Sequence, residues 1–469
     1  MLQTSFFIAE SPLKMYPEIT GICGKNELDW RYRSWSANLD GSDSECRSSW
    51  TASVSKRDQT KAKRRRAMRK GLMAVFLVLI LATSGFAADT IKIGGMLPLS
   101  GRAADLGITC KQGAELAVKE INDKGGVLGK KFDLSMADSK ANVQEIVSLC
   151  NRYVQKDNVN FLFGIVSSAG CLAAAQVAKQ EKVIFMDTVG STDTLTKEKW
   201  NRYTFRSGTC NSQEANSLAL YTAQDQKLTK FYNIGPDYEY GRTMWDLFKA
   251  KIAQQNPKAQ FIGEEWPKLF AADYTPYINA ILAAKPEVVF CSFWGGDLVA
   301  FIKQAKPYGL FDKMKWVIAT GGDITVTKAL GKDMPQGMIV DQRYYFYWPD
   351  SSTNKDFVKA YQAAYGDYPS AWAAEGYDGI YFLAEAIKKA GSLDTDKVIA
   401  ALEGLTREAP RGKESLRKED HQLSCDFMVG ETTFVKEYPF AITGKQKVFP
   451  ADEILYSIAD WQKAQSQNK

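Results

Sequence analysis

The chain of 469 residues is poor in histidine and lacks several short motifs of catalytic and nucleotide-binding sites. His421 is its only histidine, which argues against a Ser-His or Cys-His hydrolase and against most histidine metal sites. A G-x-S-x-G elbow is missing, as are G-x-G-x-x-G and a glycine-rich loop ending in G-K-S or G-K-T. We therefore expect no catalytic residue, no metal and no cofactor.

The chain also lacks an apolar run long enough to span a bilayer, which needs roughly 20 residues. One shorter run, 72–82, has eleven residues without a charge and follows Arg69 and Lys70. Small residues stand at positions −3 and −1 of a cut after Ala87, as is typical of a secretory signal peptide. We therefore predict a signal peptide at 68–87 and an exported, soluble protein in the periplasm.

A signal peptide is read at the start of a nascent chain, so we expect synthesis to begin at Met68 and residues 1–67 to be an over-extended, disordered start. Residues 1–87 carry 14 Lys and Arg against 8 Asp and Glu, which accounts for the whole net charge of +6. The remaining chain is balanced, which gives no reason to expect a nucleic-acid partner. The alternative is a genuine basic leader, because 61–66 holds five cations.

Six of the eight cysteines follow residue 88, and none belongs to a C-x-x-C pair. Their spacing has no metal signature, and an exported location leaves one or two disulfides open without indicating a pairing. The positions are Cys110, Cys150, Cys171, Cys210, Cys291 and Cys425.

Short β-rich runs alternate with helical periodicity from residue 88 onward. The first series has apolar runs at 91–94, 161–166 and 183–186, and a second series begins near residue 230. This order predicts two doubly wound α/β units with parallel sheets. Such sheets bind ligands at the carboxyl ends of their strands, so we expect a cleft between two facing sheets.

Polar, small-residue loops follow the expected strands and are the candidate binding loops. Ser167 and Ser168 stand where a strand ends and a helix begins, and the segment 187–194 repeats the arrangement. Converging hydroxyls and free N–H groups suit a carboxylate, although each serine alone is equally an N-cap. In the second unit, Trp294 is a candidate for stacking on a ligand, and Asp297 or Asp323 is either an ammonium partner or an N-cap.

Six motifs, taken in order and spacing, resemble a known family over nearly all of 90–465. They are LPLSG at 97–101, GAELAV at 113–118, EIN at 120–122, KGGVLGK at 124–130, YG at 240–241 and GYDG at 376–379. The family is that of the periplasmic substrate-binding proteins of branched-chain amino-acid type ABC transporters.

The resemblance implies a type I periplasmic binding fold: two lobes, joined by three crossings, that close around a small ligand and perform no chemistry. The expected lobes are 88–208 with about 344–425, and 209–343 with about 426–469. The expected partners are the ligand and a membrane permease, and we expect a monomer. The implied ligand-binding residues are Ser168, Gly190 and Ser191, with Ser167 and Thr192 as neighbours, then Tyr240, Trp294 and Asp323, and Leu106 where amino-acid binders often place an aromatic residue.

The ligand class stays open. A branched-chain or other hydrophobic amino acid is favoured, but the position of the family's ammonium-pairing glutamate falls at Gly322 or Asp323. Relatives also bind aromatic acids and amides. A ligand-sensing module and a two-domain α/β hydrolase are the remaining alternatives. Trp372, on a predicted helix, is assigned to the core.

Overall fold

The computed structural model describes residue 68 and residues 90–467, and the latter belong to one compact unit. The predicted disordered segment at 1–67 and the predicted signal peptide at 68–87 therefore lie, apart from residue 68, outside the described residues. None of the helices in the described part of the chain has the length and apolar character that crossing a membrane requires.

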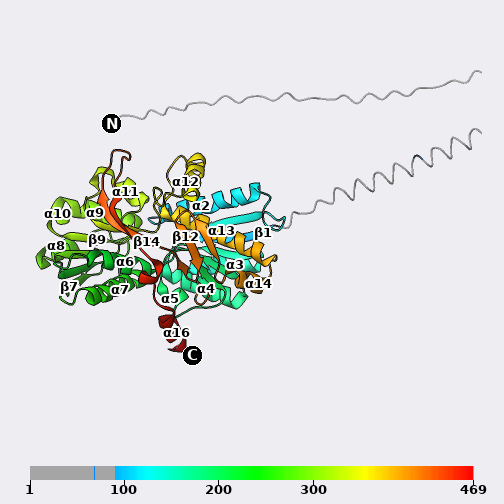
Figure 1. Ribbon diagram of the computed structural model, residues 1–469, viewed down its shortest axis with the longest axis horizontal. Coiled ribbons are helices and arrows are strands. Elements are labelled where there is room, and N and C mark those ends of the chain that lie inside the picture. Colours follow the sequence, from blue (N-terminus) through cyan, green and yellow to red (C-terminus); the bar gives the residue numbers. More distant parts are fainter. Residues whose placement is uncertain (1–67, 69–89, 468–469) are drawn as a thin grey trace, which may run out of the picture. The chain divides into compact units, whose positions relative to one another are not determined.

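The first lobe is built on five parallel strands in the order β2-β1-β3-β4-β5, drawn from blue through cyan to green in Figure 1. The strands are β1 Ile91–Leu97, β2 Phe132–Asp138, β3 Phe161–Gly164, β4 Ile184–Asp187 and β5 Thr204–Arg206. The helices of this lobe are α2 Ala104–Asp123, α3 Val143–Gln155, α4 Ser168–Glu181, α5 Asp193–Thr196, α12 Ser352–Tyr365, α13 Ala371–Ala390 and α14 Thr395–Leu402. Every residue of β3 is buried, which explains its unbroken apolar sequence.

The second lobe is built on seven strands in the order β15-β14-β10-β9-β8-β6-β7. The strands are β6 Lys230–Ile234, β7 Gln260–Glu265, β8 Val288–Cys291, β9 Lys315–Ile318, β10 Ile339–Gln342, β14 Phe427–Thr433 and β15 Ile442–Phe449. The helices are α6 Asn211–Thr222, α7 Glu239–Gln255, α8 Thr275–Ala284, α9 Gly295–Ala305, α10 Leu310–Lys313, α11 Ile324–Leu330, α15 Ala451–Ile454 and α16 Ile458–Gln467, with 3-10 turns at Lys306–Tyr308 and Gly331–Asp333. β14 and β15 add antiparallel strands to a parallel core. The two α/β units predicted from the sequence are confirmed.

Two glycines of the sequence motifs allow α2 and α13 to pack backbone against backbone. A Cβ on Gly113 would lie 1.9 Å from the carbonyl oxygen of Ala373, and a Cβ on Gly376 would lie 2.2 Å from that of Cys110. Any larger residue would push the two helices apart. This contact anchors α13, which carries Trp372 and Glu375, to the first lobe.

The chain passes between the two sheets three times: after β5, after β10, and between a small antiparallel sheet and β14. The small sheet consists of β11 Thr406–Ala409, β12 Gly412–Leu416 and β13 Leu423–Ser424. Separate hydrophobic clusters fill the faces of each large sheet, but one cluster of the second lobe continues into Leu106, Val189 and Trp372. The interior is therefore continuous across the junction of the lobes.

Candidate functional site

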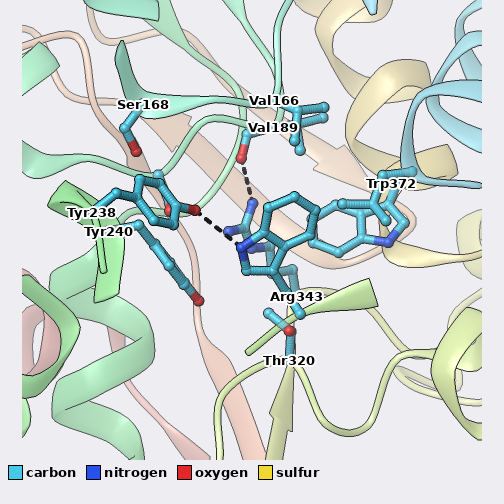
Figure 2. Close-up of a pocket in the computed structure, with 11 residues that line it drawn as sticks. Val166, Ser168, Val189, Tyr238, Tyr240, Thr320, Arg343 and Trp372 are labelled. Carbon is cyan, nitrogen blue, oxygen red and sulfur yellow. Dashed lines mark hydrogen bonds between the residues drawn. The ribbon is translucent and has the colours of Figure 1, made fainter. Parts of the chain in front are cut away.

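A cavity lies where the strand ends of both sheets meet, and it has about 330 Å³ of empty space when the part open to solvent is included. Each wall comes from loops that follow parallel strands, which is where doubly wound sheets bind ligands. Figure 2 shows eight of the residues with labels. The lining consists of Leu106, Val166, Ser168, Val189, Ser191, Tyr238, Tyr240, Trp294, Thr320, Arg343 and Trp372.

The wall of the first lobe offers two hydroxyls from neighbouring loops. Ser168 begins α4 after β3, and Ser191 follows β4; their exposed fractions are 3% and 4%. Ser167 caps α4 by accepting a hydrogen bond from the Gly170 N–H at 3.2 Å, so its hydroxyl is used within the loop. The other first N–H groups of a helix have no acceptor within it. This wall therefore presents hydroxyls and N–H groups, as an anion site requires.

Ile165, three residues before Ser168 in the loop after β3, is held in an unusual backbone conformation. Ile165 has φ +75°, a region that β-branched residues rarely occupy. The Ile165 N–H donates to the Met96 carbonyl oxygen at 2.9 Å, and its own carbonyl accepts from the Gly190 N–H at 3.1 Å. The first bond fixes the loop to β1, and the second ties the loops after β3 and β4 together, so that Ser168 and Ser191 keep a fixed relation.

Three aromatic side chains of the second lobe form the facing wall. The Trp294 Nε1 donates to the Tyr238 hydroxyl at 3.0 Å, and the Tyr240 hydroxyl donates to a Glu214 oxygen at 3.3 Å. Burial raises the pKa of both tyrosines well above the ordinary range, so both phenols stay neutral. The rings are thus fixed by hydrogen bonds and present flat apolar faces to the cavity.

Thr320 comes from the loop after β9. Its φ is +55°, and its N–H donates to the Asp341 carboxylate at 2.5 Å. Its exposed fraction is 2%, and among the described residues its hydroxyl has no hydrogen-bond partner. The second lobe therefore contributes a lining residue whose hydroxyl is unsatisfied.

Arg343 is the only charged residue in the lining. It follows β10, forms ion pairs with Glu214 at 2.7 Å and Glu375 at 3.5 Å, and lies over the Trp372 ring at 4.9 Å. Burial raises the pKa of Glu375 to about 7, against the lowering effect of the charges of Arg343 and Arg411. Burial also raises the pKa of Glu214. The guanidinium is thus fixed among carboxyl groups that lie behind the cavity.

Five of the nine predicted ligand-binding residues come together in the lining: Leu106, Ser168, Ser191, Tyr240 and Trp294. Their role as ligand contacts remains a prediction. The other four do not belong to the lining: Ser167, Gly190 and Thr192 are sequence neighbours of lining residues, and Asp323 stands three residues after Thr320.

Local bonds explain where those side chains go. The Thr192 hydroxyl donates to Glu239 of the second lobe. Asp323 caps α11 by accepting from the Thr325 N–H at 2.8 Å, and it also accepts from the Gln342 amide. Of the two alternatives left open for Asp323, the structure has the N-cap.

Sequence reasoning missed six residues of the lining: Val166, Val189, Tyr238, Thr320, Arg343 and Trp372. Thr320 stands three residues before the predicted Asp323, and Tyr238 stands two residues before the predicted Tyr240. The sequence therefore predicted the correct loops but not the side chains that line the cavity. Trp372, assigned to the core, belongs both to the core and to the lining. The one available signal for Arg343 was a lone cation between a β-rich run and five aromatic residues.

The six cysteines of the described residues are all buried and free, so no disulfide joins them. His421 lies away from the cavity lining, stacked on Phe205 with ring centroids 3.9 Å apart. Its Nδ1 lies 2.9 Å from the Thr204 carbonyl oxygen. The single histidine is therefore used in packing.

Two α/β lobes with a buried cavity at their facing strand ends define a two-lobed ligand-binding protein. Residues 90–436 match the model of the periplasmic binding protein family, and the chain belongs to that family.

The chain is similar to individual members of this family. A Leu/Ile/Val-binding protein homolog 1 from Brucella suis is 28% identical over 343 residues, covering 71% of this chain and 88% of that protein. A solved structure of an ABC transporter solute-binding protein from Rhodopseudomonas palustris BisB5, in complex with 3,4-dihydroxybenzoic acid, is 27% identical with a TM-score of 0.71 and covers 77% of this chain and 98% of that one. An ABC-type branched-chain amino-acid transporter protein from R. palustris CGA009 is 26% identical with a TM-score of 0.65 and covers 78% and 99%.

Proposed function

We propose that this chain is the substrate-binding protein of an ABC transporter, exported to the periplasm, which captures a small carboxylate between its lobes and delivers it to a membrane permease. It performs no chemistry on the ligand. Membership of the periplasmic binding protein family supports this role. We also propose that it acts as a monomer whose lobes divide at the limits expected from the sequence, 88–208 with about 344–425, and 209–343 with about 426–469.

The observation that carries the proposal is the composition of the cavity wall around Ser168, Ser191 and Arg343. Two hydroxyls and the start of α4 come from the first lobe, and the guanidinium comes from the second. Hydrogen bonds from neutral donors together with one cation suit a carboxylate. A ligand held this way touches both lobes, which is the condition for ligand-driven closure.

The lining favours an aromatic acid over an amino acid. Among the described residues, no Asp or Glu lines the cavity, so an α-ammonium group would enter without a carboxylate partner. Four of the eleven lining residues are tyrosine or tryptophan, and their rings suit a flat ligand. The relative from R. palustris BisB5, which was solved with 3,4-dihydroxybenzoic acid, supports the same class.

A hydrophobic amino acid is the second candidate. It is favoured by the similarity to a Leu/Ile/Val-binding protein homolog and by the nearby carboxyl group of Glu214. That carboxyl lies behind Tyr240 and Arg343, outside the lining. An ammonium group would have to reach it past both side chains.

Closure of the lobes is supported by direct contacts that surround the cavity. The Arg102 Nη1 of the first lobe donates to the Phe270 carbonyl oxygen of the second at 2.7 Å, and Thr192 bonds Glu239. Lys328 of α11 forms an ion pair with Asp367 of the first lobe. We infer that the ligand binds the closed form more tightly than the open form, because a ligand with equal affinity for both would not shift the equilibrium between them.

Calorimetry with benzoate, 4-hydroxybenzoate, leucine and valine tests the proposal. We expect a benzoate to bind, and Ser168→Ala to weaken it about tenfold by removing a buried hydrogen bond. Ser139→Ala is a control, since Ser139 is also buried but lies outside the cavity. Binding of leucine alone would select the second candidate, and binding of none of the four would contradict the proposal.

A further inference from the structure

The hydroxyl of Thr320 is buried and unsatisfied at the wall of the cavity. Among the described residues no hydrogen-bond donor or acceptor reaches its Oγ1. A buried hydroxyl without a partner costs free energy, and most such groups in proteins are bonded. An unpaired hydroxyl on a residue that lines the cavity therefore indicates a partner supplied by the ligand.

The backbone of Thr320 has a left-handed conformation, which threonine rarely adopts. At φ +55° a β-branched side chain is strained, and strain of this kind persists only where the surroundings impose it. Three bonds impose it here: the Thr320 N–H to Asp341 at 2.5 Å, the Gly321 N–H to Ile318 at 3.2 Å, and the Asp323 N–H to the Thr320 carbonyl at 3.2 Å. These bonds fix the position of the Thr320 backbone in the loop after β9.

Thr320 stands on the wall opposite the proposed carboxylate site. Figure 2 shows Ser168 and Val189 on one side of the drawn residues and Thr320 on the other, with the rings of Tyr238 and Tyr240 between them. The Arg343 guanidinium donates a hydrogen bond to the Val189 carbonyl oxygen at 2.6 Å, so the cation lies at the same side of the cavity as Val189 and Ser168. A flat acid with its carboxylate on that side would direct the far edge of its ring toward Thr320.

We propose that Thr320 is a specificity-determining residue which hydrogen-bonds a ring hydroxyl of the ligand, and that the transported compound is a hydroxylated aromatic monocarboxylate. This inference rests on the proposed function, because it needs an aromatic carboxylate in the cavity. A hydroxyl both donates and accepts, so it satisfies Thr320 in either orientation. An unsubstituted ring would leave the Thr320 hydroxyl unpaired, and the site would discriminate against it.

Calorimetry with benzoate, 3-hydroxybenzoate and 4-hydroxybenzoate tests the inference. We expect the unaltered protein to bind one of the hydroxybenzoates at least about tenfold more tightly than benzoate. In Thr320→Val, which keeps the shape of the side chain, that preference should fall to about twofold or less, while the affinity for benzoate stays the same or rises. Thr320→Ser keeps the hydroxyl and should retain the preference.

Thr209→Val is the matched control, because Thr209 is also buried with an unpartnered hydroxyl and lies outside the cavity lining. It should leave the preference unchanged. If the preference survives in Thr320→Val, or if the unaltered protein binds all three acids equally, the inference is wrong and the proposed function stands. If leucine binds and no benzoate does, the inference is also wrong. Failure to bind any carboxylate overturns both.

Discussion

The Arg343 Nη1 donates a hydrogen bond of 2.6 Å to the Val189 carbonyl oxygen, and this bond joins the second lobe to a binding loop of the first. The same guanidinium pairs with Glu214 of α6 and Glu375 of α13. Arg343 follows directly after β10, where the chain crosses between the sheets. One buried cation thus contacts the cavity, both lobes and a crossing segment.

Loss of Arg343 should destabilise the protein strongly. Arg343→Met leaves the buried carboxyl group of Glu214 without its cation and removes one of the two arginines that pair with Glu375, and we expect the free energy of unfolding to fall by about 3 to 5 kcal/mol. Urea unfolding at neutral pH measures the change. The difference in the free energy of unfolding should be smaller at acidic pH, where the carboxyl groups are protonated. Arg242→Met, which removes an exposed ion pair with Asp237, is the control and should cost less than about 1 kcal/mol. Equal effects of the two variants would contradict the assignment.

The contact between Arg102 and the Phe270 carbonyl should slow ligand release. Arg102→Ala removes a bond between the lobes, and opening of the lobes would break that bond, so we expect a dissociation rate about two- to tenfold higher. Stopped-flow measurement of ligand release tests this. Arg242→Ala changes an arginine whose side-chain bonds stay within the second lobe, and should leave the rate unchanged. An unaltered rate in Arg102→Ala would show that this contact does not stabilise the closed form.

Stability should fall as the pH rises through neutrality because of Glu375. Its pKa is raised from 4.5 to about 7 by burial, so the folded protein holds this proton more tightly than the unfolded chain does. Its contribution is fully present below about pH 4.5 and is lost as the pH rises through about 7, on the order of 3 kcal/mol. Burial raises the pKa of Glu414 to about 8, which acts in the same direction.

Chemical unfolding between about pH 5 and about pH 8, compared for the unaltered protein and Glu375→Gln, isolates this contribution. The variant should lose less stability over the range. His421 has the opposite sign, because burial lowers its pKa and its contribution is lost as the pH falls below 6.5. Since both proteins retain His421, the difference between them reports Glu375 alone. Parallel curves would contradict the raised pKa.

The cysteines of the described residues should be unreactive in the folded protein. All six are buried, and burial raises the pKa of the Cys110, Cys150 and Cys425 thiols to about 12. The thiolate is the reactive form, so iodoacetamide at neutral pH should label none of the six. Peptide mapping after labelling measures this, and unfolding in urea should expose all six. A disulfide between any two would be inconsistent with the structure.

Much of the fold follows from local sequence, because parallel strands covered on both faces must be apolar runs. The run at 161–164 and the polar loop after it are examples, and they lead directly to Ser168. The antiparallel strands β14 and β15 were not predicted, since β14 pairs with β10 across a long stretch of chain and β15 pairs with β14. Lobe assignment of the C-terminal segments therefore came from the family resemblance.

Side-chain direction within the binding loops could not be predicted. Asp323 and Thr320 stand three residues apart in the same loop, and a carboxylate there fits an N-cap as well as a ligand contact. Thr320, which has a left-handed backbone and an N–H bonded to Asp341, lines the cavity, whereas Asp323 caps α11. That bond joins residues 21 positions apart, and no local pattern signals it.

The central claim is that the chain binds a small carboxylate between its lobes, and mass spectrometry of gently purified protein tests it most directly. Native spectra should show one small acid bound per chain, which is released intact on denaturation and identified by its mass. We expect an aromatic monocarboxylate that carries a ring hydroxyl. Recovery of a compound without a carboxyl group, or chemical conversion of an added carboxylate by the protein, would contradict the account.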